Sequence, residues 1–384
     1  DKGGVGAALR KIDELAEKQS IYEKMMTPDD TSILFSMIDD CVQLGTIPFS
    51  ILARHGFIAK TLLLSLESKG IITEDELGLI QSSTHTVASE IVNDMKMMRD
   101  DVLSKSSFMQ KYGHLRPGTY DILSLRYDQL EDIGVSDKSI GVLEHKLDYK
   151  FNSKQTDSIN ILLKEEGFNG LDAGKLLIYI QQSIAGREYS KFVYTKTISD
   201  MLEIIAQYGE KFNLNRDDMS HIPLEVILNA ATSSEFESPE MRLRTISLQE
   251  KEKHASSLAV RLPQVLFDVS GVHIVPFQVS HPNFITNKKV TAASIVIDQN
   301  VNPSSLDGKI VLIENADPGF DWIFGHQIAG LITKYGGVNS HMAIRCAEFG
   351  IPAAIGCGEQ RFERLVNVDM ILLDSSSSII QHLH

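Results

Sequence analysis

The chain has 384 residues, of which 43% are hydrophobic, and it carries a formal net charge of −14. Its length allows one large core or two to three smaller ones. The acidic balance argues against a nucleic-acid-binding surface, which needs a basic face. No apolar run approaches membrane-spanning length, no secretory signal opens the chain, and the three cysteines lack CxxC spacing. We therefore expect free thiols, a cytoplasmic location, and neither a nucleic-acid nor a membrane partner.

Residues 2–100 show helical periodicity almost throughout. The segments Ile47–Leu66 and Glu74–Met98 are each expected to form one long helix, with Gly70 as the break between them. Two glycine-rich segments, at 3–6 and 170–175, do not have the spacing of a nucleotide-binding loop. We therefore expect no ATP site in this chain.

A loop at 111–121, with the sequence KYGHLRPGTYD, interrupts the helical pattern. It gathers His114, Arg116 and Asp121 around two glycines and a proline, which is a mixture typical of a small-molecule site. The residues alone leave a second interpretation open, in which Arg116 and Asp121 simply pair with each other in a surface turn.

From 148 to 212 the chain is expected to be helical, with a loop at 149–156, and the segment 186–192 carries Arg187, Glu188 and Lys191. From composition alone, a solvated charged face is the usual interpretation of such residues. Residues 232–260 are polar and of mixed charge, which indicates a linker or an exposed helix.

Beyond residue 260 the pattern changes to short β-rich runs, at 265–269, 272–276 and 291–297, between glycine, proline and asparagine turns. Further strands are expected at 309–313, 330–333 and 370–373, and helices at 318–327 and 341–349. The fold class is therefore multidomain: a mainly α-helical domain (1–231), a linker (232–260) and a compact α/β domain (261–384).

The most informative stretch, 331–358, reads LITKYGGVNSHMAIRCAEFGIPAAIGCG. A buried strand is followed by Gly336 and Gly337, and then by a helix that opens at His341 and ends at Gly350. Such a turn presents backbone N–H groups and the positive end of a helix dipole to an anion. The same dipole disfavours the imidazolium, so a neutral His341 keeps a lone pair that can attack phosphorus and form a phosphohistidine.

The neighbours of His341 suit this chemistry. Ser340 can cap the helix and donate to a phosphate oxygen, and Arg345 lies one turn further along the same face. Gly336 and Gly337 leave room for the phosphate to approach. The competing interpretation, that a single histidine after Gly-Gly is only a turn or capping residue, is the commoner one for an isolated histidine.

The stretch closely resembles the swivelling phosphohistidine domain of phosphoenolpyruvate-synthase-like phosphotransferases, whose pattern is G-G-x-x-[ST]-H-x-A-x-x-A-R-x-x-G-I-P. Gly336, Gly337, Ser340 and His341 hold the family positions. Two departures are visible: Met342 replaces a small residue, and Ala347 stands where the family has its arginine, with Arg345 two places earlier. The segments 307–313 and 316–319 resemble a strand and a T-D-P turn of the same domain.

The resemblance also implies roles upstream. The loop at 111–121 is similar to a segment of the family's acceptor-binding helical domain, which implies acceptor contacts for His114, Arg116 and Asp121. The R-E-x-x-K-F run implies phosphate contacts for Arg187 and Lys191. In such a relay an upstream ATP-grasp domain uses ATP and Mg²⁺ to phosphorylate the histidine, which then carries the phosphoryl group to a small-molecule acceptor. No acidic cluster in this sequence has metal-ligand spacing, so no metal ligand is assigned.

Only the residues 342–384 follow His341, too few for the roughly 250-residue barrel that carries the pyruvate site of the true synthases. The order of domains is similar to that of rifamycin phosphotransferases and L-glutamine kinases. With 7% aromatic residues, we expect a small polar acceptor, such as an amino-acid amide like L-glutamine, with AMP and phosphate as co-products. The alternatives are a rifamycin-type antibiotic phosphotransferase, a phosphoenolpyruvate-synthase-like enzyme, and a non-catalytic phosphocarrier or regulatory module.

Overall fold

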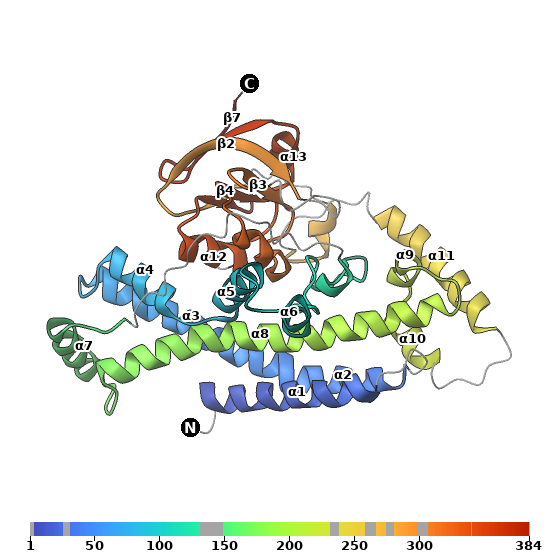
Figure 1. Ribbon diagram of the computed structural model, residues 1–384, viewed down its shortest axis with the longest axis horizontal. Helices are drawn as coiled ribbons and strands as arrows, with labels where there is room; N and C mark the ends of the chain where they lie inside the picture. The colour runs from blue at the N-terminus through green and yellow to red at the C-terminus, as the bar shows by residue number, and fades with distance from the viewer. Residues whose placement is uncertain are drawn as a thin grey trace.

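The computed structural model describes residues 4–25, 31–130, 149–230, 238–257, 266–273, 280–297, 306–338 and 340–383. Over these residues the chain forms a helical part followed by an α/β part (Figure 1). The expected change from helical to mixed structure is therefore confirmed. Most of the expected linker, at 239–257, is helical.

The helical part is organised along α8 (Ala173–Glu210), a helix of 38 residues. Helices α1 (Val5–Met25) and α3 (Ile47–Ser68) pack against it. The other helices of this part are α2 (Ile33–Asp40), the π-helical η1 (Cys41–Thr46), α4 (Glu74–Ser83), α5 (Val87–Arg99), α6 (Lys105–Tyr112), the 3-10 helix η2 (Tyr127–Gln129), α7 (Ser153–Glu165), α9 (Arg216–Ser220), α10 (Leu224–Ala230) and α11 (Pro239–Ser257).

The expected single helix at 74–98 is wrong, because the chain breaks between α4 and α5. Thr86 takes an extended conformation there, and its hydroxyl accepts a hydrogen bond from the backbone N–H of Ser89. The Ser89 hydroxyl in turn bonds the backbone N–H of Thr86, so the two residues form a capping box that starts α5.

The stretch Ile33–Ser68 is long and apolar enough to cross a membrane by length and composition, contrary to what the sequence led us to expect, and 22% of its most apolar window is buried. A core helix passes the same test, and α3 within this stretch packs on α1 and α8. The cysteines Cys41, Cys346 and Cys357 are buried and free, as expected.

The α/β part contains a seven-stranded mixed sheet of order β1-β5-β4-β3-β2-β6-β7. Strands β2, β3, β4 and β5 run parallel to their neighbours in that series, while β1, β6 and β7 pair antiparallel at the two ends. The elements are η3 (Val269–His273), β1 (Asn283–Ile285), β2 (Lys289–Val296), β3 (Ile310–Ile313), η5 (Pro318–Gly325), β4 (Gly330–Thr333), α12 (His341–Phe349), β5 (Ala353–Ile355), α13 (Glu359–Val366), β6 (Met370–Asp374) and β7 (Ile379–Leu383).

Two of the expected strands are not found as such. Residues 269–273 form the 3-10 helix η3 instead. The remainder of those two segments lies outside the described residues, apart from 266–268, which form no strand. The strands β3 and β4 are buried at every position, as expected for the centre of a parallel sheet covered on both faces.

One apolar cluster joins the two parts of the chain. Met95 on α5 and Phe108 on α6 share it with Trp322 on η5 and Met342 on α12, all of them buried. Figure 1 shows α5, α6 and α12 lying between α8 and the sheet. The α/β part therefore sits over the middle of α8, and α12 faces the helical part.

Candidate functional site

The turn between β4 and α12 has the geometry that the sequence predicts. Strand β4 ends at Thr333, α12 begins at His341, and the Ser340 hydroxyl accepts a hydrogen bond from the backbone N–H of Ala343 at 3.4 Å. Gly336 has a φ of +129°, and a β-carbon there would lie 2.7 Å from the Ala316 side chain. At Gly337, no atom of the described residues other than its chain neighbours lies within 4 Å of the corresponding position. The turn thus requires glycine at 336 and leaves space at 337.

His341 is held by a carboxylate of its own domain. Its Nε2 lies 2.6 Å from Oδ1 of Asp321, which is on η5, and 14% of the His341 side chain is exposed. A carboxylate can only accept a hydrogen bond, so Nε2 is the donor, and the neutral ring then keeps its lone pair on Nδ1. Sequence reasoning missed Asp321, because no local pattern links η5 to the start of α12.

Arg345 is buried in a cluster of carboxylates, with 1% of its side chain exposed. Its terminal nitrogens donate to Glu188 on α8 and to Glu348 on α12. Burial acts to lower the pKa of Arg345, but the surrounding carboxylates raise it overall. Its Nε has no hydrogen-bond partner among the described residues and lies 4.0 Å from Oδ1 of Asp321. The terminal nitrogens that we expected at a phosphate are thus engaged elsewhere, and only Nε faces the Asp321–His341 pair.

Lys191 and Arg187 lie on the part of α8 that this cluster contacts. The Lys191 ammonium has no hydrogen bond or ion pair within the described part of the chain. Burial lowers the pKa of Lys191, and the negative charges of Asp317 and Asp321 partly oppose this effect. The Arg187 guanidinium lies 5.5 Å from the centre of the Phe57 ring on α3. The charges of Asp317 and Asp321 act on Lys191, and that of Arg345 acts on Arg187, so both residues lie near the α/β part, although the Arg187 guanidinium packs on α3.

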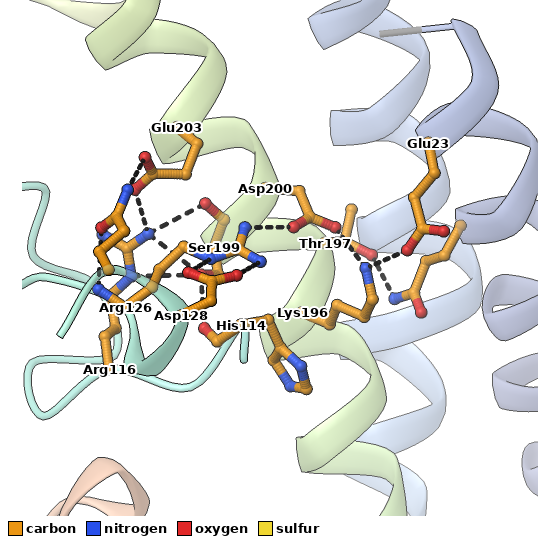
Figure 2. Close-up of polar contacts among 12 residues, drawn as sticks. Glu23, His114, Arg116, Arg126, Asp128, Lys196, Thr197, Ser199, Asp200 and Glu203 are labelled. Carbon is orange, nitrogen blue, oxygen red and sulfur yellow. Dashed lines mark hydrogen bonds and ion pairs between the residues drawn. The ribbon is translucent and has the colours of Figure 1, made fainter. Parts of the chain in front are cut away.

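Arg116, by contrast, is a buried structural residue with 2% exposure. Its guanidinium donates to the carbonyl oxygens of Asp121, Ser124 and Ser199, to the Ser199 hydroxyl, and to Glu203 at 2.8 Å (Figure 2). These bonds use its donors, so none is left for a ligand. We do not carry Arg116 into the candidate site.

His114 is buried as well, with 3% exposure, and its ring lies 4.7 Å from the Phe192 ring between centroids. Figure 2 shows this ring apart from the Arg116 and Arg126 network. Burial holds the pKa of His114 well below its ordinary value. The Phe192 carbonyl slightly opposes this shift, but neither ring nitrogen has a partner with hydrogen-bond geometry. Asp121 is exposed, and its Oδ1 accepts a bond from the backbone N–H of Leu123. The structure does not bring His114 and Asp121 together with His341.

The same loop nevertheless touches the α/β part through residues that sequence reasoning did not select. The Thr119 hydroxyl donates to the carboxylate of Asp317, and the Tyr127 hydroxyl donates to the Gly319 carbonyl at 2.8 Å. The turn at 316–319, which stood out in the sequence, is therefore a contact between the two parts.

Among the described residues, no three His, Cys, Asp or Glu side chains are arranged to hold a metal ion. Asp321, Glu188 and Glu348 converge instead on the Arg345 guanidinium. The residues present do not fit a Mg²⁺ site, and we assign none.

Comparison with known proteins agrees with this geometry. Residues 306–378 match the family described as "PEP-utilising enzyme, mobile domain". An alignment 282 positions long, which covers 65% of this chain, shows 21% identity to a rifampicin phosphotransferase of Bacillus cereus. The chain spans about a third of that protein, since the match covers 31% of its length. Residues 306–378 are therefore similar to the mobile domain of PEP-utilising enzymes.

Proposed function

We propose that this chain is part of a phosphohistidine-type phosphotransferase in which His341 carries the phosphoryl group. The observation that supports the proposal most directly is the placement of His341. It opens a helix capped by Ser340, it is oriented by Asp321, and it lies in a domain docked against the α8 segment that carries Lys191.

The chemistry consists of a displacement that loads the imidazole and a displacement that unloads it. With ATP as donor, the bond that breaks on loading joins the α- and β-phosphates, so AMP leaves, and water then releases the terminal phosphate from the ring before the acceptor attacks. A lone pair of the imidazole forms an N–P bond as the P–O bond of the donor breaks, and the leaving oxygen takes the electron pair. An acceptor oxygen or nitrogen then forms its own bond to phosphorus, and the electron pair of the N–P bond returns to the ring. If Nε2 is the attacking atom, its proton passes to Asp321 first and returns when the ring is released. If Nδ1 attacks, the proton stays on Nε2 throughout and remains hydrogen-bonded to the Asp321 carboxylate.

We place the acceptor between α12 and α8, beside Lys191 and Arg187. Both cations are partly withdrawn from water, so they stabilise phosphoryl charge more strongly than exposed side chains would. The unpartnered N–H of Arg345 faces the same Asp321–His341 pair and is a further donor for a phosphoryl oxygen. Gly337 and Ser340 line the same turn.

Within this proposal the donor is ATP with Mg²⁺, bound by an upstream ATP-grasp domain of the same protein, and the acceptor is a small molecule. The preference for an amino-acid amide such as L-glutamine rests on the sequence and gains no support from the comparison. The relative that matches is named a rifampicin phosphotransferase, which favours a rifamycin as the second candidate acceptor.

Potassium phosphoramidate, a small phosphoryl donor, tests the first half of the proposal on the chain itself. Intact-mass analysis should show one acid-labile phosphoryl group, and ³¹P NMR should identify the nitrogen that carries it. His341→Gln should lose this label. Labelling that is unchanged in His341→Gln would overturn the assignment.

The full-length protein tests the second half. With ATP and Mg²⁺, it should form AMP and phosphorylate either L-glutamine or a rifamycin, as judged by mass spectrometry of the product, and His341→Gln should abolish both. Turnover that survives this substitution would favour a non-catalytic mobile domain. Loading from labelled phosphoenolpyruvate instead of ATP would favour a phosphocarrier or a synthase-like enzyme.

A further inference from the structure

A buried ion pair ties α12 to α8. The Arg345 guanidinium leaves the α/β part and donates to the carboxylate of Glu188, 157 residues earlier in the chain. The two side chains are 1% and 8% exposed. The guanidinium also lies 3.4 Å from the Thr86 hydroxyl, at the start of α5. Arg345 thus contacts the helical part at two points, whereas the hydrogen bond of His341 to Asp321 lies within the α/β part.

The position of this pair along the two helices sets which residues face each other. Arg345 lies four residues after His341, which is one turn along α12. Glu188 lies three residues before Lys191 on α8, again on one face. The Arg345–Glu188 contact therefore fixes the position of α12 along α8. In this position the negative charges beside His341 act on Lys191.

A buried ion pair suits a contact that must form and break repeatedly. The attraction between Arg345 and Glu188 is offset by the loss of hydration of both charges, so such a pair adds little net stability. It is nevertheless highly specific, because removing one partner leaves a buried charge without compensation. The apolar cluster around Met95 and Trp322 holds the two parts together but does not impose a comparable register.

We propose that Arg345 and Glu188 are a positioning pair, which docks the mobile domain so that His341 faces the acceptor side of α8. The proposal rests on the proposed function only in naming this docked state the acceptor-transfer state. It also assigns a role to the altered position of the arginine in this chain, at 345 with Ala347 at the family position. In docking, Glu188 acts through the terminal nitrogens of Arg345 and forms no bond to the phosphoryl group, while the Arg345 Nε–H remains the donor proposed above.

The test is a charge exchange in the chain, with Glu188→Arg, Arg345→Glu and the double variant compared with wild type. Two readouts are measured in parallel: the rate at which phosphoramidate labels His341, and amide hydrogen exchange over 86–95 and 341–349. In each single variant a buried charge has lost its partner, so the domain should undock. Amide hydrogen exchange should then rise in both segments, and phosphoramidate should label His341 at least about tenfold faster. The double variant should return both readouts towards wild type.

Controls separate docking from other effects. Arg361→Glu makes the same charge reversal on the exposed face of α13, within the mobile domain, and should leave both readouts unchanged. Circular dichroism shows whether a reversal variant folds, and the milder pair Glu188→Gln and Arg345→Lys replaces any that does not. In full-length enzyme, Glu188→Gln should slow phosphoryl transfer to the acceptor while loading of His341 from ATP is unchanged.

Unchanged exchange and labelling in the single variants, or a double variant that behaves no better than either, would overturn the positioning role. If phosphoramidate fails to label His341 in every variant, the phosphohistidine proposal fails. Hydrogen exchange still reports on docking in that case, so the two failures can be told apart.

Discussion

Gly319 in η5 lies in close contact with the main chain of Arg116. A β-carbon placed on Gly319 would lie 1.7 Å from the Arg116 carbonyl oxygen and 2.6 Å from the α-carbon of Pro117. The α/β part can approach the helical part this closely only because residue 319 has no side chain.

Gly319→Ala should therefore separate the two parts or destabilise them. The atoms in the way belong to the backbone and cannot swing aside, so we expect a loss of about 3 kcal/mol or more in the free energy of unfolding. Denaturant titration measures it. Gly78→Ala on α4 is the control, because its β-carbon meets no atom within 4 Å and should stabilise the helix slightly. Equal stability of the two variants would contradict the close approach.

Asp321→Asn should slow phosphorylation of His341 by about tenfold to a hundredfold. The amide keeps the shape of the carboxylate but can donate to the ring, so it no longer fixes the proton on Nε2. The rate of labelling by phosphoramidate across pH measures this, and the pH profile should change with the rate. Asp369→Asn, an exposed carboxylate of the same domain, should label like wild type. An unaltered pH profile in Asp321→Asn would argue against the orienting role.

Arg116→Met should cost about 3–5 kcal/mol in unfolding free energy, because it removes a buried cation and leaves Glu203 and three carbonyl oxygens with fewer donors. Thermal or urea denaturation measures the loss. Arg244→Met, which removes a half-exposed arginine from α11, should change stability far less. A stable Arg116→Met variant with weakened acceptor binding would instead restore Arg116 to the acceptor site.

The Glu348 carboxyl should make the free energy of unfolding depend on pH near neutrality. Burial raises its pKa from 4.5 to about 7, with Glu188 and Asp321 acting in the same direction and Arg345 opposing them. A folded-state pKa above the unfolded value gives stability that is complete below about pH 4.5 and is lost as the pH rises through about 7. Wild type should therefore lose stability relative to Glu348→Gln between pH 5 and 8, measured by urea denaturation. A difference that does not vary with pH would show that Glu348 stays ionised.

His114→Phe should stabilise the protein, because the buried imidazole makes no hydrogen bond in the described structure. We expect a gain of about 1 kcal/mol at pH 8, and a larger gain at pH 5. The pKa of His114 is lowered on folding, so its contribution is present above its ordinary value of 6.5 and is lost as the pH falls below it. Parallel denaturation at the two pH values measures this. A variant that is less stable at both would indicate an undetected partner for the ring.

The strand, turn and helix around His341 were predictable because their signals are local. Glycines, a capping serine and a helix-ending glycine lie within a few residues of one another, so the sequence alone specifies the turn. The break between α4 and α5 also had a local signal, the Thr86 and Ser89 capping box, which we overlooked. In each case the interacting groups are neighbours in the chain.

The partners of the charged side chains were not predictable in the same way. Asp321 meets His341 across 20 residues, and Glu188 meets Arg345 across 157. Arg116 looked like a ligand contact because a loop rich in glycine, proline and polar residues suits a binding site equally well. Only the fold shows that α8 supplies Ser199 and Glu203 to its guanidinium.

The length of α8 has a consequence for how the chain can vary in sequence. Its 38 residues form a rod roughly 57 Å long, and the cations near 187–191 and the carboxylates near 200–203 are held on it a few turns apart. A rod of this kind keeps the Glu188 contact with Arg345 and the Glu203 contact with Arg116 at a constant spacing. Loops that cross α8 can then change in sequence without shifting these two contacts relative to each other.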